Sequence, residues 1–482
     1  MGLLGILLGL GLLLFLAYRG WSILLLAPVA ALVAAAFSGE PLLAHWTQTF
    51  MQNAATFVAQ FFPLFLLGAL FGKLMDDSGS VTVIAEEMTR RLGEKRAMLA
   101  VVLAGAIVTY GGVSLFVAFF VLAPMATALF RSAGVPRRLM PAAIALGTST
   151  FTMSAMPGTP AIQNAIPMPF FGTTPFAAPG LGLIASAIML GFGMWWLTRA
   201  EKTARAKGEG FGDEAVAGDI ANDQFLRERA TASHEFDTAE LAHGAHSTSA
   251  PPLWVAALPL VVVVGVNLIM SLAVLPRMDV SFLAEERWGN TTLAAVGGVW
   301  SVAVALASAI VVLVALNFRR LPALKDTMDA GANASVLPAF SVASLVGFGA
   351  VVAALPAFAL VRDWVLGIEG GPLVSLAIAT NILAALTGSA SGGLTIALDA
   401  LGAAYMQLAA QTGLDPALMH RVAVIGAGTL DSLPHNGAVV TLLAVCGSTH
   451  AKSYFDLVMV AVVGAILALV AVIVIGGAVG SF

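Results

Sequence analysis

Long apolar runs separated by short polar segments make up most of the chain. Residues 253–275, 291–316 and 454–478 each reach or exceed the roughly 20 residues that a membrane-spanning helix needs. Other apolar runs predict further spans at residues 2–17, 21–37, 49–74, 181–197 and 333–360. The pattern therefore predicts an all-α polytopic membrane protein.

Two polar stretches interrupt the apolar pattern. Residues 147–160 are rich in Thr, Ser and Pro, and residues 428–437 contain Asp, Ser, Pro, His and Asn. Irregular backbone at membrane depth is tolerated only where it is buried in protein or lines a water-filled cavity. We therefore predict two discontinuous helices, broken near residues 148–160 and 428–437, that meet near the middle of the bilayer and hold a small solute between them.

A pair of apolar arms joined by a glycine-rich tip precedes each polar stretch. The first pair has its tip near residues 110–114, with basic residues at both outer ends. The second pair has its tip near residues 387–393. Short arms around a flexible tip are typical of re-entrant hairpins, which enter and leave the membrane on the same side.

Composition supports the same class of protein. Of the 482 residues, 59% are hydrophobic and 10% are charged, against about 45–50% and 25% in soluble domains. The net charge of −4 selects no partner, so we expect no nucleic acid, and the single cysteine, Cys446, offers no disulfide, metal or redox motif. No cofactor is expected. Residues 1–16 lack a basic leader and a cleavage site, so we expect a retained first span.

Basic residues in the short loops orient the spans, because they prefer the cytoplasm. Placing Arg19 on the cytoplasmic side puts the N-terminus outside. It also puts residues 199–252 and the opening of the first hairpin on the cytoplasmic side. The second hairpin then opens from the outside, where only Arg362 and Arg421 fall. The two halves thus have opposite topology, as in secondary transporters with inverted repeats and a site at the midplane.

This topology divides the chain into successive parts. They are N-terminal scaffold spans (1–48), a first inverted repeat (49–198), a hydrophilic linker (199–252), further scaffold spans (253–331) and a second inverted repeat (332–482). The linker lacks hydrophobic periodicity and is expected to be a flexible connector. Its histidines His234, His243 and His246 could bind a metal, although such residues are usually only solvent-exposed. Residues 76–95 predict a helix along the membrane surface, or a solvated loop helix.

Several segments resemble the gluconate permease (GntP) family of the ion transporter superfamily. They are residues 70–79, 90–96 and 100–105 in the first half, and 387–393 and 412–419 in the second. Together with the order of spans, the resemblance covers most of the chain. It implies proton-driven uptake of small carboxylates, typically sugar acids and hydroxy acids, by an elevator mechanism. It also implies a scaffold and a moving transport domain, and a homodimer in a bacterial-type inner membrane.

The two polar stretches depart from this family pattern. Members that carry gluconate have a His-Val-Asn-Asp-Pro type sequence at the second break, where residues 432–436 here read Ser-Leu-Pro-His-Asn. Their first break is rich in His and Pro, whereas residues 150–160 contain Thr, Ser and Met and no histidine. A 3-hydroxybutyrate-like acid or a ketoacid is therefore an alternative to gluconate.

Hydroxyl groups and glycines at the tips and breaks are the candidate substrate-binding groups. Helix N-termini attract anions, hydroxyls donate to carboxylates, and glycine admits a ligand close to the backbone. The first half supplies Tyr110, Gly111, Gly112, Ser114, Thr148, Ser149, Thr150, Gly158, Thr159 and Asn164. The second half supplies Gly388, Ser389, Ser391, Gly392, Thr429, Ser432 and Asn436. Any single one could instead serve tight helix packing, which is common in membranes.

Asp431 and His435 are the candidate proton carriers, because an ionisable residue within a span is costly and usually functional. The alternatives are a neutral imidazole that caps the next helix and a carboxylate satisfied by nearby N–H groups. Asp399, in an arm of the second hairpin, is either a further proton carrier or a group facing a wet vestibule.

The sequence thus predicts a proton-coupled carboxylate symporter. Sodium-coupled symport or cation/proton antiport is the alternative, with Asp431 and Asp399 as the deep carboxylates that could hold a cation. A membrane-embedded enzyme would need a nucleophile–base or metal constellation, and the pair of Cys446 and His450 has no evident third partner.

Overall fold

The helices of the computed structural model follow the predicted apolar runs. The structure describes residues 1–482 except 18, 20, 213–244 and 435. Within the described residues there is no strand, and 8 helices are long and apolar enough to cross a membrane. The predicted all-α membrane fold is confirmed. Most of the predicted linker, with His234 and His243, and the candidate His435 lie outside the described residues.

Helices of very different length make up the first half. They are α1 (Gly2–Ala17), α2 (Ile23–Ser38), α3 (Leu42–Ala44), α4 (Met51–Asp77), α5 (Ser80–Leu92), α6 (Ala97–Tyr110), α7 (Leu115–Ala133), α8 (Met140–Thr148), α9 (Phe151–Ser154), α10 (Ile162–Ala165), α11 (Pro167–Phe171) and α12 (Pro179–Ala206). A π-helical segment, His45–Phe50, joins α3 to α4.

The second half repeats this mixture of long and short helices. They are α15 (Leu253–Ile269), α16 (Leu293–Asn317), α17 (Leu324–Ala334), α18 (Val336–Ala354), α19 (Phe358–Leu366), α20 (Pro372–Thr387), α21 (Ala390–Thr412), α22 (Pro416–Thr429), α23 (Gly437–Val445), α24 (His450–Val458) and α25 (Gly464–Val479). The predicted span at 333–360 is shorter than expected, since α18 ends at Ala354, just before Pro356.

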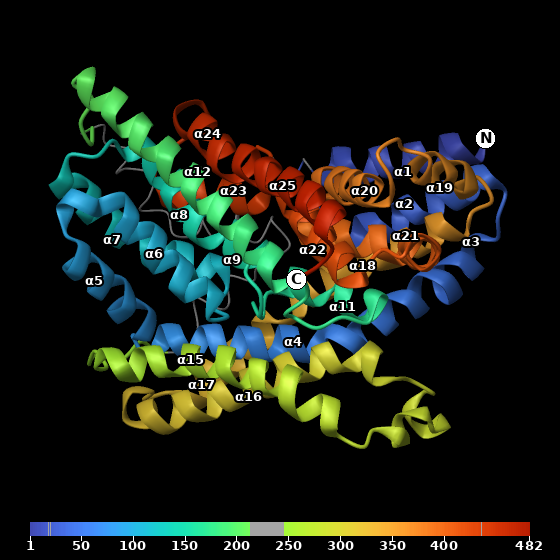
Figure 1. The fold of residues 1–482 in the computed structure, drawn as a ribbon, viewed down its shortest axis with the longest axis horizontal. Coiled ribbons are helices and arrows are strands. Elements are labelled where there is room, and N and C mark those ends of the chain that lie inside the picture. The colour runs from blue at the N-terminus through green and yellow to red at the C-terminus, as the bar shows by residue number, and fades with distance from the viewer. Residues whose placement is uncertain (18, 20, 213–244, 435) are drawn as a thin grey trace.

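Helix α4 runs across the molecule, and other helices lie on both sides of it (Figure 1). It packs against α16, α17 and α18. Helices α15, α16 and α17 lie on one side of α4, and the hairpins and broken helices lie on the other (Figure 1). The α1–α2 pair packs on α18 at one end, while α6, α7 and α8 pack together at the other.

A buried ion pair lies at the C-terminal end of α4. Lys73 Nζ lies 2.9 Å from Asp77 Oδ1, and both side chains are buried. Thr327 of α17 donates to the other carboxylate oxygen of Asp77 at 2.6 Å. Charges taken out of water need such full hydrogen bonding to offset their desolvation. The contact therefore fixes α17 against α4.

Helix α5 corresponds to the polar, periodic segment at 76–95. Its apolar face, which includes Val81 and Ile84, is buried against α6, α7 and α15. Toward the end of the helix, the exposed Arg90 and Arg91 pair with the buried Glu87. The hydrogen bond from Arg91 lowers the pKa of the Glu87 carboxyl. The helix is therefore seated on neighbouring helices and is not a free loop helix.

Two helical hairpins turn near the middle of the molecule. In the first, α6 and α7 are joined by residues 111–114, close to the predicted tip. In the second, only Gly388 and Ser389 separate α20 from α21, so the tip is shorter than the predicted 387–393. The Ser389 side chain explains the difference, because it accepts a hydrogen bond from Gly392 N and so starts α21 early.

Both predicted helix interruptions are present. Helix α8 ends at Thr148, and after the single turn of α9 the chain is irregular up to α10. Helix α22 ends at Thr429, and α23 begins only at Gly437. Backbone groups left free at these ends need partners, which hairpin tips and side chains provide.

Candidate functional site

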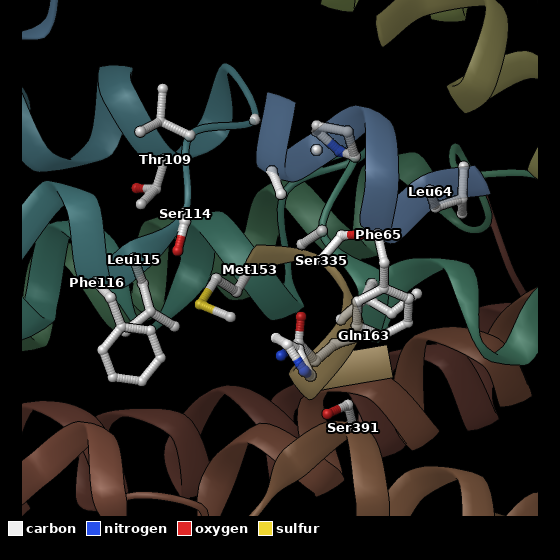
Figure 2. Close-up of a pocket in the computed structure, with 18 of the residues that line it drawn as sticks. Leu64, Phe65, Thr109, Ser114, Leu115, Phe116, Met153, Gln163, Ser335 and Ser391 are labelled. Carbon is white, nitrogen blue, oxygen red and sulfur yellow. The ribbon is translucent and has the colours of Figure 1, made fainter. Parts of the chain in front are cut away.

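Two adjoining cavities lie between α4, the first hairpin tip and the broken helices. The larger, of about 190 Å³, is lined by α4, by the first tip with Ser114, and by the start of α21 with Ser391 (Figure 2). The smaller, of about 30 Å³, lies toward α23. Leu115, Met153 and Gln163 line both cavities, so the two adjoin, and we refer to them as the two branches of one candidate site.

The two helix interruptions meet at the smaller cavity. Its wall contains Ser149 from the first break, and Asp431, Ser432 and Asn436 from the second. Nearby, a Cβ added at Gly428 would lie 3.3 Å from Ser154 Cβ, so α22 and α9 touch. A solute in this space would contact both halves of the chain.

Asn436 joins the second break to the second hairpin tip. Its amide nitrogen donates to Asp431 Oδ1 at 2.9 Å and to the Gly388 carbonyl at 2.7 Å. Its amide oxygen accepts from the backbone N–H groups of Ala438 and Val439, which caps α23. One side chain thus fixes a tip, a helix start and the candidate proton carrier.

The first hairpin tip is joined to the first break in a comparable way. Tyr110 donates from its hydroxyl to the Pro157 carbonyl at 2.8 Å. Gly112, with φ of +101°, lies against Pro160, and this left-handed conformation suits glycine. Gly111 packs on Leu260 of α15, where a Cβ would lie 2.2 Å from Leu260 Cδ2. In each half, therefore, the tip is tied to the break.

Several predicted hydroxyls do not face either cavity. Thr148, Thr150 and Thr429 each donate to the carbonyl four residues earlier, at 2.7–2.8 Å. Thr159 accepts from Ala161 N. Such bonds to the local backbone are typical of Ser and Thr in helices and at their ends.

The remaining candidates serve packing or lie elsewhere. The Gly158 carbonyl accepts from Asn267 Nδ2, and a Cβ at Gly392 would lie 2.4 Å from Leu345 Cδ1. Asp399 is exposed on α21 and lines neither cavity.

A buried polar cluster lies behind the cavities. Arg421, which the loop-charge rule places at the outer surface, is fully buried in α22. Its guanidinium donates to the carbonyls of Ala177 and Ser154 at 2.7 and 3.1 Å. The sequence analysis counts Arg421 among the basic residues of the outer side and does not foresee this burial. Arg421 lies six positions after the Asp415 cap of α22, in the interior, where its fork of N–H donors meets the carbonyls of Ala177 and Ser154.

Asn164, a predicted substrate contact, belongs to this cluster instead of the cavity wall. Its Oδ1 lies 3.1 Å from His420 Nε2 and 3.4 Å from Arg421 Nη1. Its amide nitrogen donates to the carbonyls of Thr159 and Pro175. The side chain therefore holds the short helix α10 in place.

Gln163 is a cavity residue that the sequence analysis misses. It lies next to Asn164 on α10, and Figure 2 shows its amide inside the larger cavity with Met153 and Ser391. It is 8% exposed, and its Oε1 has no hydrogen-bond partner in the described part of the chain. The sequence does offer a signal, which is the pair of adjacent amide side chains, Gln163 and Asn164, in a break flanked by prolines. Polar side chains that are buried in such a segment usually have hydrogen-bond partners.

Comparisons with known proteins point to permeases. A sequence profile of the GntP family permeases matches residues 1–170. An uncharacterized transporter of Bacillus subtilis (strain 168), YxjC, is 39% identical over 481 residues, which cover 98% of each chain. A high-affinity gluconate transporter of Escherichia coli (strain K12) is 36% identical over 104 residues, or 21% of this chain and 23% of the transporter.

A solved structure shares the fold. It is that of MtrF from Neisseria gonorrhoeae, described as illuminating a class of antimetabolite efflux pumps. The two chains align with a TM-score of 0.54 over 90% of this chain and 84% of MtrF. At 13% sequence identity this likeness concerns the fold alone.

Proposed function

Because the chain belongs to the GntP family of permeases and is therefore a multi-pass secondary transporter, we propose that it imports a small organic carboxylate together with a proton. The substrate is a hydroxy acid or sugar acid, of the gluconate or 3-hydroxybutyrate kind. It binds in the branched cavity between the hairpin tips and the two breaks.

Helix N-termini around the cavity favour a carboxylate. Leu115, at the start of α7, lines both branches, and the preceding Ser114 makes no side-chain cap to this helix. Ser391 and Ala438 bring the first turns of α21 and α23 to the same space. Each helix start carries roughly half a positive charge. The side chains of Asn436 and Ser389 already accept from N–H groups at the starts of α23 and α21, whereas α7 has no side-chain cap. Together these helix starts can hold an anion without a fixed basic side chain.

One observation supports the coupling to a proton: the Asp431 carboxyl lines the smaller cavity. An anionic substrate would therefore meet a second carboxylate. Two like charges about 6 Å apart repel by roughly 3 kcal/mol at an effective dielectric constant of about 20. Protonation of Asp431 removes this repulsion, so the anion binds best together with a proton. This linkage is the basis of the proposed symport.

The proposed movement is an elevator with inverted repeats in the inner membrane of a bacterial-type cell. The hairpins and broken helices carry the cavity, while α4, joined to α17 by the hydrogen bond from Thr327 to Asp77, forms one wall that stays behind. The N-terminus lies outside and the central linker lies in the cytoplasm. The homodimer that the family resemblance implies is part of the proposal, and light scattering of the purified protein tests it.

Uptake into proteoliposomes tests the function. Labelled gluconate and 3-hydroxybutyrate are offered with an inward proton gradient, with an inward sodium gradient, or with neither. We expect accumulation of at least one acid under the proton gradient, abolished by a protonophore. Accumulation that follows sodium contradicts proton coupling, and failure to carry any of a panel of hydroxy-, keto- and sugar acids contradicts the substrate class.

A further inference from the structure

The inference concerns the polar atoms that face the substrate space, and it rests on the proposed function. Most side-chain hydroxyls around the larger cavity already have partners. Thr109 donates to the Gly105 carbonyl at 2.5 Å, Ser335 donates to the Ala332 carbonyl at 2.7 Å, and Ser391 lies 3.2 Å from the Ser389 hydroxyl. These groups are satisfied without a ligand.

Gln163 differs from these residues. Among the described residues that line either branch, it is the one whose buried side-chain oxygen has no partner. Leaving such an acceptor unpaired costs about 1–3 kcal/mol. Buried orphan groups in folded proteins are uncommon and call for an explanation, such as a ligand or a water that is bound in use.

The surroundings of Gln163 hold its position firmly. The next residue, Asn164, is fully buried and makes hydrogen bonds in four directions, to His420, Arg421 and the carbonyls of Thr159 and Pro175. Asn164 therefore fixes α10 from behind, and Gln163 presents its amide on the cavity side (Figure 2). A protein side chain whose position is already fixed loses little conformational entropy when it binds a ligand.

We propose that Gln163 is a specificity-determining residue that accepts a hydrogen bond from a hydroxyl group of the substrate. Its position at the junction of both branches suits this role, because a carboxylate directed to the helix N-termini leaves the rest of the molecule beside Gln163. A hydroxyl donates to the amide oxygen, whereas a keto group cannot donate at all. The site thereby selects hydroxy acids over the matching keto or unsubstituted acids.

Competition in proteoliposomes tests this role with pairs of acids that differ in one group. Labelled gluconate is transported, and 3-hydroxybutyrate, acetoacetate and butyrate compete. In the natural protein we expect 3-hydroxybutyrate to inhibit about tenfold more strongly than butyrate, which is the ratio expected for one buried hydrogen bond. Gln163→Met, similar in size but without the acceptor, should bring this ratio close to one.

Two further variants separate specificity from folding. Gln163→Asn keeps a neutral amide acceptor on a side chain one methylene shorter and should retain part of the preference for the hydroxy acid. Gln411→Met removes an exposed amide at the end of α21 and should leave the ratio unchanged. An unchanged ratio in Gln163→Met overturns the inference, and so does an equal loss for all three acids, which would mean contact with the carboxylate. If the natural protein transports gluconate but does not prefer the hydroxy acid, only the inference fails. If it binds no acid, the proposed function fails with it.

Discussion

Asn436 is the residue that most directly couples local structure to the site. It caps α23, bonds to the second hairpin tip and bonds to Asp431. Ser, Asp and Asn are common caps, so the sequence can suggest such a role, but not the additional contact with a hairpin tip 48 positions away.

Replacing Asn436 with Ala should therefore affect both stability and transport. Loss of the cap costs about 0.5–2 kcal/mol, and loss of the bond to Gly388 O frees the second tip. We expect a lower melting temperature in detergent and a several-fold higher KM for uptake.

Asp415→Ala is the matched control for Asn436→Ala. Asp415 caps α22 through Ala417 N, and it lies outside the two cavities. It should lower the melting temperature by a similar amount without changing KM. A KM that stays normal in Asn436→Ala would argue against its place in the substrate site.

The sequence analysis selects some of the residues that line the cavities and misses others, for a physical reason. Ser149, Asp431, Ser432 and Asn436 line the smaller cavity together, as expected for broken helices that meet. Thr148, Thr150 and Thr429 have the same chemistry but donate to carbonyls of their own helices, and nothing in a linear pattern tells which hydroxyl will do so. Gln163 follows no periodicity because its helix is a single turn between prolines.

At the scale of elements, Arg421 holds the two broken helices together. Its fork of N–H groups reaches from α22 to the end of α9 and to the segment before α12. A buried cation satisfied by carbonyls is strongly dependent on geometry, because each lost hydrogen bond to a charged group costs about 1.5–3 kcal/mol.

Arg421→Lys should therefore destabilise the protein although it keeps the charge. A lysine ammonium cannot span both carbonyls and is harder to desolvate. We expect a clear decrease of the melting temperature, measured by thermal unfolding in detergent. The control is Arg362→Lys, because Arg362 forms an exposed ion pair with Asp363. This substitution should change the melting temperature little, since exposed ion pairs contribute about 0–1 kcal/mol to stability. Equal melting temperatures for the two variants would contradict the bridging role.

Element boundaries were predicted well where composition dictates them and poorly where side chains do. Apolar length places α15 and α16, since each must match a bilayer. The early start of α21 depends on Ser389 as a helix cap, which a hydropathy pattern does not reveal.

At the scale of the whole molecule, the all-helical membrane fold follows from hydropathy, whereas opposite orientation of the halves and the elevator remain predictions. The single cysteine, Cys446, is buried, so Cys446→Ala provides a background for labelling. In that background, Ser114→Cys should react with an impermeant thiol reagent from either side of the membrane, with the side shifting as the substrate gradient is reversed.

Thr412→Cys, at the exposed end of α21, is the control for side-dependent labelling. It should react from one side under every gradient, because it lies far along the helix from the cavity. Labelling of Ser114→Cys from a single side under all conditions would contradict alternating access of this cavity.

Coupled proton entry tests the central claim most directly. Proteoliposomes with an internal pH indicator receive gluconate or 3-hydroxybutyrate, whichever is transported, and internal acidification is recorded together with uptake of the acid. The account predicts that the natural protein acidifies the interior as the anion enters. It predicts that Asp431→Asn exchanges labelled for unlabelled acid but moves no protons. Anion entry without acidification in the natural protein, or equal acidification in Asp431→Asn, would contradict it.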